Sequence, residues 1–144
     1  YLNNQTVEVK EYKYHVPMHD AKCHDEEEPL LKQFVGGREL TVTLVSTAAH
    51  DLNNVLLRFP HGNQVVTIRS RQGGESIILP NTGQNKSLKK ILQAKKVAPW
   101  RREHMPLIYY DNTLVLVVLG SNEFIFADGF QSSHNKVGLK INWQ

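Results

Sequence analysis

Hydrophobic and polar residues alternate along much of the first half of the chain, and this period of two is typical of half-buried β-strands. Turn-forming sequences interrupt the alternation, with Gly36–Gly37 and His61–Asn63 as the clearest cases. The segments between them are rich in Val, Thr and aromatic residues, which favour strands. Strands are therefore predicted at 6–14, 40–45, 55–59 and 64–69.

The hydrophobic spacing changes after a polar loop at 80–85. Leu88, Ile91 and Leu92 recur three and four residues apart, which predicts one main helix with an apolar face. Ser87 stands directly before them, and a serine hydroxyl suits the N-cap position because it accepts a hydrogen bond from the first turn. A second face of this segment would carry polar side chains at the same spacing: Lys86, Lys89, Gln93 and Lys96.

Two prolines delimit a short helical turn further along. Pro99 suits the first position of a helix, and Pro106 stops it. The segment 107–120 that follows is predicted to form a central hydrophobic hairpin around Asp111–Asn112. Two more strands are predicted, at 124–126 and at 137–143.

Many strands with one main helix and a short Pro-Trp helical turn define the α+β class. The 144 residues are 40% hydrophobic and 22% charged, which is typical of a globular protein that buries a core. We find no internal repeat and no linker, so residues 1–144 are expected to form one domain. The longest apolar run, 114–119, is far shorter than the roughly 20 residues of a membrane helix, so we expect no membrane association.

The cysteine content and the first residue bear on the origin of the chain. The single cysteine, Cys23, cannot form an intramolecular disulfide, which fits a reducing cytoplasmic location. The chain begins at Tyr1 with a strand-like pattern directly behind it. We therefore expect it to be part of a longer polypeptide.

Positive charge is concentrated in the window 69–103. This window holds nine Lys or Arg residues against two Glu, a net charge of +7, whereas the whole chain carries +3. Concentrated positive charge suits a polyanionic partner, because each neutralised phosphate releases condensed counterions. The alternative is a lysine-rich face that only keeps the protein in solution.

Motifs for catalysis or metal binding are weak. The sequence at 72–74, Gln-Gly-Gly, lacks the lysine and hydroxyl of a phosphate-binding loop and is better explained by a tight turn. The His and Cys residues at 15–24 match no zinc-ligand spacing, and neighbouring acidic residues destabilise a Cys23 thiolate. His104 is expected at the surface or partly packed, and Trp100 is expected to pack in the core rather than to stack on a base. We predict no catalytic residue, metal or cofactor in this chain.

Four segments together carry a resemblance to a known family: "TIRSRQGGE" (67–75), "SLKKILQAKKVAPWRRE" (87–103), "MPLIYYDNTLVLV" (105–117) and "LKINWQ" (139–144). They resemble the C-terminal domain of tRNA(Ile)-lysidine synthase, well over 65–120 and more loosely over the last strand. A Leu-Lys-Lys helix followed by Pro-Trp and an arginine is the most specific part. The family usually has glycine where this chain has Lys96, and an apolar residue where it has Arg101.

The resemblance implies a role inside a bacterial, cytoplasmic ligase. The whole synthase uses ATP and Mg to activate the wobble cytidine of an isoleucine tRNA with a CAU anticodon, and then attaches lysine to it. That chemistry belongs to an N-terminal catalytic domain with a Ser-Gly-Gly-x-Asp-Ser loop, which this sequence lacks, so this chain alone is expected to be inactive. The resemblance also implies that this domain grips the acceptor stem of the tRNA and has a β-sandwich-like α+β fold.

The charge distribution predicts a basic surface for a polyanion, and the resemblance implies that this polyanion is tRNA. An A-form stem exposes mainly phosphates and 2′-hydroxyls, and arginine adds bidentate phosphate recognition. Two alternatives remain open: a module that pairs through the apolar hairpin with its own copy or another domain of the synthase without touching tRNA, and an independent hydrolase or metal enzyme using the His-Cys segment. The residues predicted to carry most of the tRNA contact are Lys89, Lys90, Arg101 and Arg102, assisted by Arg69, Arg71 and Lys86.

Overall fold

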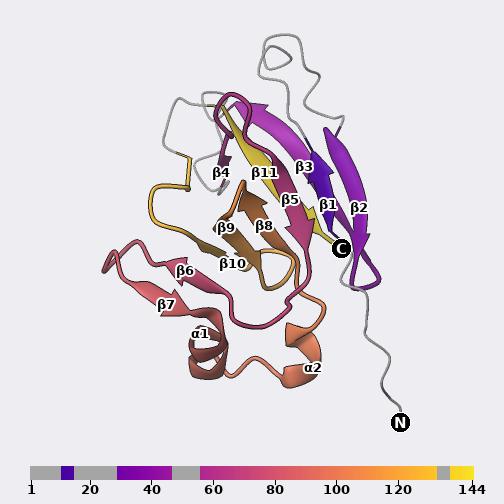
Figure 1. The fold of residues 1–144 in the computed structure, drawn as a ribbon. Coiled ribbons are helices and arrows are strands. Elements are labelled where there is room, and N and C mark those ends of the chain that lie inside the picture. The colour runs from indigo at the N-terminus through magenta and orange to yellow at the C-terminus, as the bar shows by residue number, and fades with distance from the viewer. Residues whose placement is uncertain (1–10, 15–28, 47–55, 133–136) are drawn as a thin grey trace.

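Two antiparallel sheets form the body of the protein (Figure 1). The computed structural model describes residues 11–14, 29–46, 56–132 and 137–144. The five-stranded sheet has the order β1 (Tyr12–Tyr14), β5 (Val66–Arg69), β8 (Leu107–Tyr110), β9 (Thr113–Val118) and β10 (Phe124–Phe126). The four-stranded sheet has the order β2 (Leu31–Val35), β3 (Arg38–Ser46), β11 (Val137–Trp143) and β4 (Leu57–Arg58).

The two sheets enclose the larger hydrophobic core between them. Val42 and Leu44 of β3 and Ile141 of β11 are buried against Ile68 of β5 and Ile108 of β8. These residues alternate along their strands because successive side chains point to opposite faces of a sheet. Burial of one face from each sheet confirms the α+β prediction and the sandwich-like arrangement.

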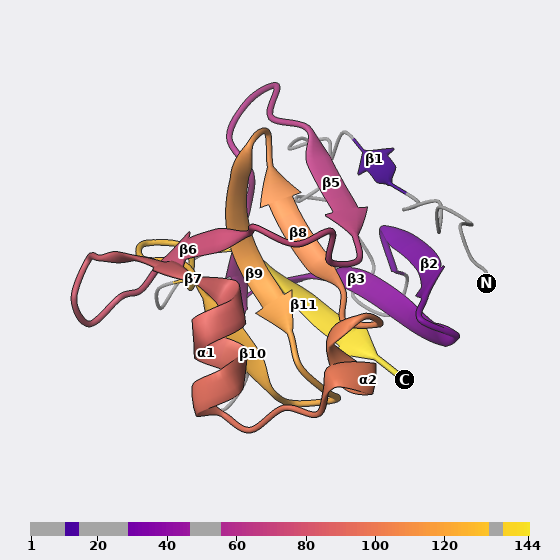
Figure 2. The same cartoon turned by 60° about the horizontal axis from the view of Figure 1, so that its bottom comes forward.

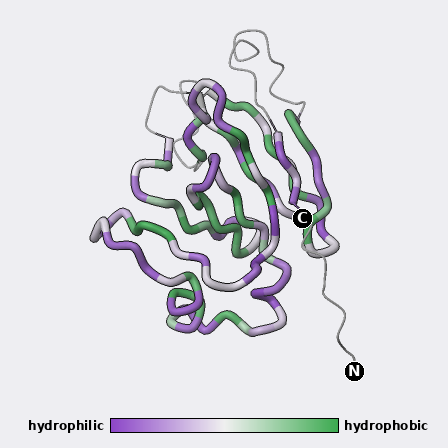
Figure 3. The backbone as a smooth tube through the Cα atoms, in the orientation of Figure 1, coloured by the Kyte–Doolittle hydropathy of each residue, from purple (hydrophilic) through white to green (hydrophobic). Residues whose placement is uncertain are grey.

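A third layer covers part of the other face of the five-stranded sheet. It consists of a two-stranded hairpin, β6 (Ser76–Ile78) with β7 (Asn85–Ser87), and the helix α1 (Leu88–Ala94). This layer forms the second core cluster, in which Ile77, Leu88, Ile91 and Leu92 pack with Leu107, Val117 and Ile125. A short helix, α2 (Pro99–Arg102), follows, and α1 and α2 lie at the same end of the molecule (Figure 2). Coloured by hydropathy, the central strands are mainly hydrophobic, whereas the helical end carries long hydrophilic stretches (Figure 3).

Capping at both ends fixes the length of α1. Ser87 is the N-cap, as predicted, and its side chain accepts a hydrogen bond from the Lys90 N–H at 3.5 Å. At the other end the Val97 N–H donates to the Leu92 carbonyl at 3.0 Å, and Lys96 takes a left-handed φ of 57°. This is a Schellman ending, in which a residue with positive φ reverses the chain and satisfies the last carbonyls.

Most predicted elements are confirmed, with differences where the sequence is polar. The predicted strand 40–45 lies within β3, the hairpin 107–120 is β8–β9, and the last strand is β11. The predicted strand 6–14 is described only from residue 11 onward, where it contains β1. The strands β2, β6 and β7 were not predicted. β7 reads Asn-Lys-Ser and has no hydrophobic period, so Lys86 lies on this strand rather than on the face of the helix.

Candidate nucleic-acid interface

The outer side of α1 carries exposed lysines because the inner side is fixed by its core residues. Lys89 and Lys90 are exposed, whereas Leu88, Ile91 and Leu92 are buried. The sequence from Ser76 to Arg102 contains no acidic residue. The lysines that are exposed on β7, on α1 and just beyond it are Lys86, Lys89, Lys90, Lys95 and Lys96.

Both arginines of α2 hold the helix in place. None of its four residues is buried, so hydrophobic packing does not fix its position. The Arg101 guanidinium donates to the Leu119 carbonyl at 2.9 Å, and Arg102 Nε donates to the Val97 carbonyl at 2.8 Å. A guanidinium has five N–H donors, so each side chain retains donors for a phosphate. Arg101 is exposed and Arg102 is half-buried, so both side chains are at least partly accessible to solvent, as a contact with a phosphate requires.

The prediction that Trp100 packs in the core is wrong. Its side chain is 73% exposed. The buried positions on either side of α2 are occupied by Val97 and Met105, both part of the second core cluster. Burial of those two residues leaves Trp100 on the outer side of the turn, among the basic residues.

Arg69 and Arg71 lie in a separate network around a buried carboxylate. The Glu75 side chain is 2% exposed, and its oxygens lie 3.1 Å from Arg69 Nη1 and 3.5 Å from Arg71 Nε. The backbone N–H groups of Gln72 and Gly73 also donate to it, at 2.7 and 3.1 Å. Burial alone would raise the pKa of Glu75, but the backbone N–H groups of Gln72 and of Glu75 itself, together with the Arg69 guanidinium, hold its pKa below the ordinary value. This carboxylate also confirms the tight turn predicted at 72–74, because it closes that turn by accepting its N–H groups.

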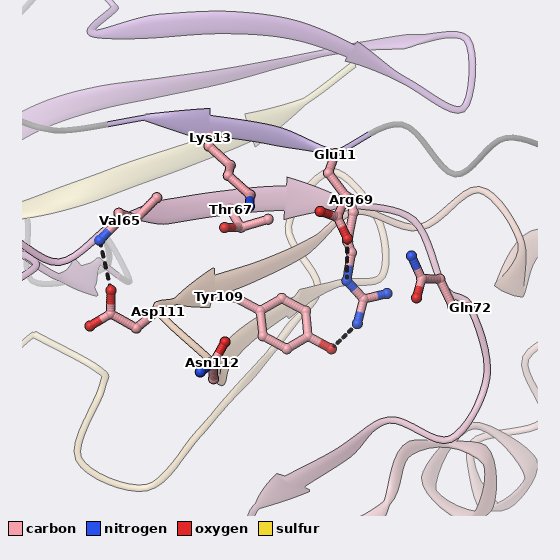
Figure 4. A pocket seen from close by; sticks show the side chains of 9 residues that line it. All are labelled: Glu11, Lys13, Val65, Thr67, Arg69, Gln72, Tyr109, Asp111 and Asn112. Atoms are coloured by element: carbon pink, nitrogen blue, oxygen red, sulfur yellow. Dashed lines mark hydrogen bonds and ion pairs between the residues drawn. The ribbon is translucent and has the colours of Figure 1, made fainter.

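An open pocket of about 650 Å³ lies beside Arg69, over β1, β5 and β8 (Figure 4). Arg69 Nη2 donates to the Tyr109 hydroxyl at 2.6 Å, and its guanidinium carbon lies 4.5 Å from the centre of the Tyr109 ring. Burial raises the pKa of Tyr109. The lining carries Lys13 and Arg69 but also Glu11 and Asp111. Because its charges are mixed, this pocket does not favour a polyanion.

The predicted contact residues therefore fall into two groups. Lys86, Lys89, Lys90, Arg101 and Arg102 belong to β7, α1 and α2, which lie at the same end of the molecule (Figures 1 and 2), whereas Arg69 and Arg71 lie beside Glu75. His104 is exposed, as expected. The His and Cys residues at 15–24 lie outside the described residues, and the described part of the chain holds no group of three acidic, His or Cys side chains suited to a metal. Within the described ranges, neither helix has the length and apolar character needed to cross a membrane.

The fold and this surface define a class: an antiparallel sandwich domain with a basic helical end. The family described as "TilS substrate C-terminal domain" matches residues 66–143. This chain belongs to that family. The match extends through β11 and confirms the resemblance that the sequence carries between 65 and 120 and in its last strand.

Individual relatives agree with this assignment. The tRNA(Ile)-lysidine synthase of Proteus mirabilis is 30% identical over 100 residues, which cover 69% of this chain and 22% of that protein. The synthase of Coxiella burnetii is 25% identical over 140 residues, covering 96% of this chain and 30% of that protein. A crystal structure of a TilS C-terminal domain superposes with a TM-score of 0.63 at 15% identity, covering 94% of this chain and 97% of the other, so the two share the fold. The chain thus spans less than a third of the length of these curated relatives.

Proposed function

We propose that residues 1–144 form the C-terminal tRNA-binding domain of a tRNA(Ile)-lysidine synthase and grip the acceptor stem of the isoleucine tRNA. The observation that carries this proposal is the exposed basic surface of β7, α1 and α2 in a chain of the TilS family. ATP, Mg and the attachment of lysine to the wobble cytidine belong to an N-terminal catalytic domain of the full-length enzyme. This chain contributes affinity for the tRNA and has no ligase activity alone.

The chemistry of the surface supports a grip on phosphates. Lys89 and Lys90 extend from a helix whose inner face is fixed in the core, and the described ion pairs do not include either of them. Arg101 and Arg102 add guanidinium donors on a neighbouring turn. Because an A-form stem hides its base edges in a deep groove, exposed cations bind it through its phosphate backbone. Arg69 and Arg71 support the surface indirectly, by stabilising the loop before β6.

The alternative of pairing through the apolar hairpin finds no support in the fold. The residues from Leu114 to Leu119 are all buried within this chain, in its two core clusters. A hairpin buried on both faces has no apolar side to offer a second copy or another domain. A homodimer formed through another surface stays a prediction.

The experiment that tests the proposal is the affinity of the Lys89→Ala/Lys90→Ala variant for the isoleucine tRNA at moderate salt. Loss of two phosphate contacts is expected to weaken binding about tenfold, equivalent to about 1.4 kcal/mol. The matched control is Lys32→Ala/Lys140→Ala, which removes two exposed lysines from the four-stranded sheet and is expected to leave affinity within about twofold. Unchanged affinity of the first variant would remove the α1 lysines from the mechanism.

A further inference from the structure

The two tryptophans of the chain occupy opposite environments. Trp143 is 3% exposed, and its Nε1 donates to the Val35 carbonyl at 3.0 Å. Trp100 is 73% exposed. An indole is among the largest apolar side chains, and its burial is strongly favourable. The folded structure gains little of this stabilisation from Trp100, so its contribution to folding does not explain its presence.

The turn that carries Trp100 is fixed without help from the indole. Hydrogen bonds from Arg101 to the Leu119 carbonyl and from Arg102 to the Val97 carbonyl anchor α2 on both sides. Pro99 restricts the backbone at the first position of the helix. Trp100 is therefore held outward on a rigid support, and a ligand that contacts it need not order the backbone first.

The charge around Trp100 selects the kind of ligand. Lys95 and Lys96 are exposed and precede it by five and four residues, so the Lys96 Cα lies within about 14 Å of the Trp100 Cα. No acidic residue lies between Glu75 and Glu103 in the sequence. An exposed aromatic ring that follows two exposed lysines in the sequence matches a nucleic-acid strand, in which a base stacks on the ring while phosphates meet the charges. An apolar protein surface would leave those cations without partners.

We propose that Trp100 is a stacking site for an unpaired base of RNA, with Lys95 and Lys96 binding the adjacent phosphates. This inference rests on the proposed function and adds to it a contact that a phosphate grip on a duplex does not need. Bases inside a duplex are already stacked on each other, so the ligand of Trp100 is a single-stranded nucleotide next to the stem. The site thus distinguishes a stem with a single-stranded extension from a blunt stem.

The test compares two RNA hairpins that share one stem, one blunt and one with a four-nucleotide single-stranded 3′ extension. The extension is expected to tighten binding by the wild-type chain about tenfold, within the range for one stacked base. It is also expected to quench the emission of Trp100, while the buried Trp143 gives a constant background.

Trp100→Ala should bind both hairpins with the affinity that the wild type has for the blunt one, and Trp100→Phe should retain most of the gain in affinity. Phe34→Ala is the matched control, because Phe34 is another exposed aromatic side chain, 63% exposed, on β2 of the other sheet.

The outcomes separate this inference from the proposed function. Equal affinities of the wild type and Trp100→Ala for the extended hairpin, with salt-dependent binding of the blunt hairpin intact, would overturn the stacking site alone. Failure of the wild type to bind either hairpin would overturn the proposed function and the stacking site together. A blue shift of Trp100 emission with rising protein concentration in the absence of RNA would show that a second copy covers the indole, and would also overturn the inference.

Discussion

Glu75 is the single residue on which the loop between β5 and β6 depends most. Its carboxylate accepts hydrogen bonds from Arg69 and from the backbone of the turn and forms an ion pair with Arg71, and its side chain is 2% exposed. The pKa of Glu75 is lower in the folded chain than its unfolded value of about 4.3. The stabilisation it provides is therefore complete above that unfolded value and is lost as the pH falls below it.

Glu75→Gln is accordingly expected to lower the free energy of unfolding by about 2–4 kcal/mol at pH 7, because Arg69 and Arg71 lose their buried counter-charge. Below about pH 4.3 the stability of the variant should also fall less steeply with decreasing pH than the stability of the wild type. Urea denaturation at pH 7 and at stepwise lower pH measures both effects. Glu103→Gln removes an exposed carboxylate and is expected to change stability by less than about 0.5 kcal/mol. Identical pH profiles for the wild type and Glu75→Gln would contradict this role.

Lys96 combines a structural cost with a proposed function. Its φ of 57° lies in the left-handed region, which a side chain with a Cβ disfavours. Glycine at position 96 relieves the strain of a positive φ, but its larger backbone entropy in the unfolded chain offsets part of that gain. Lys96→Gly is therefore expected to raise the free energy of unfolding by about 0.5–1 kcal/mol. Lys96→Ala keeps the Cβ and removes the same charge, so it should weaken RNA binding equally without the stabilisation. Thermal or urea unfolding measures the stabilities of both variants. Equal stabilities would contradict the claim that Lys96 is strained at this position.

At the scale of elements, the turn between β2 and β3 packs against the end of α2. A Cβ added to Gly36 would lie 2.6 Å from both the Cβ and the carbonyl oxygen of His104, whereas one added to Gly37 would meet nothing within 4 Å. Both glycines have positive φ, of 60° and 78°. A backbone atom cannot move aside without displacing its element, so of these two glycines Gly36 is the one whose close contact ties the β2–β3 turn to the residues after α2.

Gly36→Ala is therefore expected to lower the free energy of unfolding by about 1–3 kcal/mol more than Gly37→Ala does. Both variants carry the cost of a positive φ, so the difference isolates the contact with His104. Urea unfolding of the pair gives the comparison. Equal losses of stability would show that the turn is free to move away from α2.

The elements that sequence could predict are those with a clear hydrophobic period. Leu88, Ile91 and Leu92 defined α1, and the strict alternation of 137–143 defined β11, because each places its apolar residues on one buried face. β7 could not be predicted, since Asn-Lys-Ser carries no period and its pairing with β6 is set by the hairpin turn. Trp100 was misplaced for a related reason: residue type suggests burial, but only the tertiary structure shows that Val97 and Met105 fill the core instead.

At the scale of the whole molecule, the basic window divides into two parts with different roles. From the sequence, Arg69 and Arg71 were predicted to assist the lysines of α1 in the tRNA contact. The structure pairs these arginines with Glu75, only six and four residues further along the chain, and a count of charges does not show which charges are paired. The surface proposed to meet phosphates is consequently smaller, and consists of Lys86, Lys89, Lys90, Lys95, Lys96 and Arg101 with part of Arg102.

The measurement that tests this account most directly is the salt dependence of binding to the isoleucine tRNA transcript. About five or six neutralised phosphates predict a slope of log K against log salt concentration between about −3.5 and −5.5. The slope should flatten by about 1.4 to 1.8 in Lys89→Ala/Lys90→Ala, one phosphate per lysine, and should be unchanged in Lys32→Ala/Lys140→Ala. A slope near zero for the wild type, or the wild-type slope in the α1 variant, would contradict the claim that the helical end grips the tRNA.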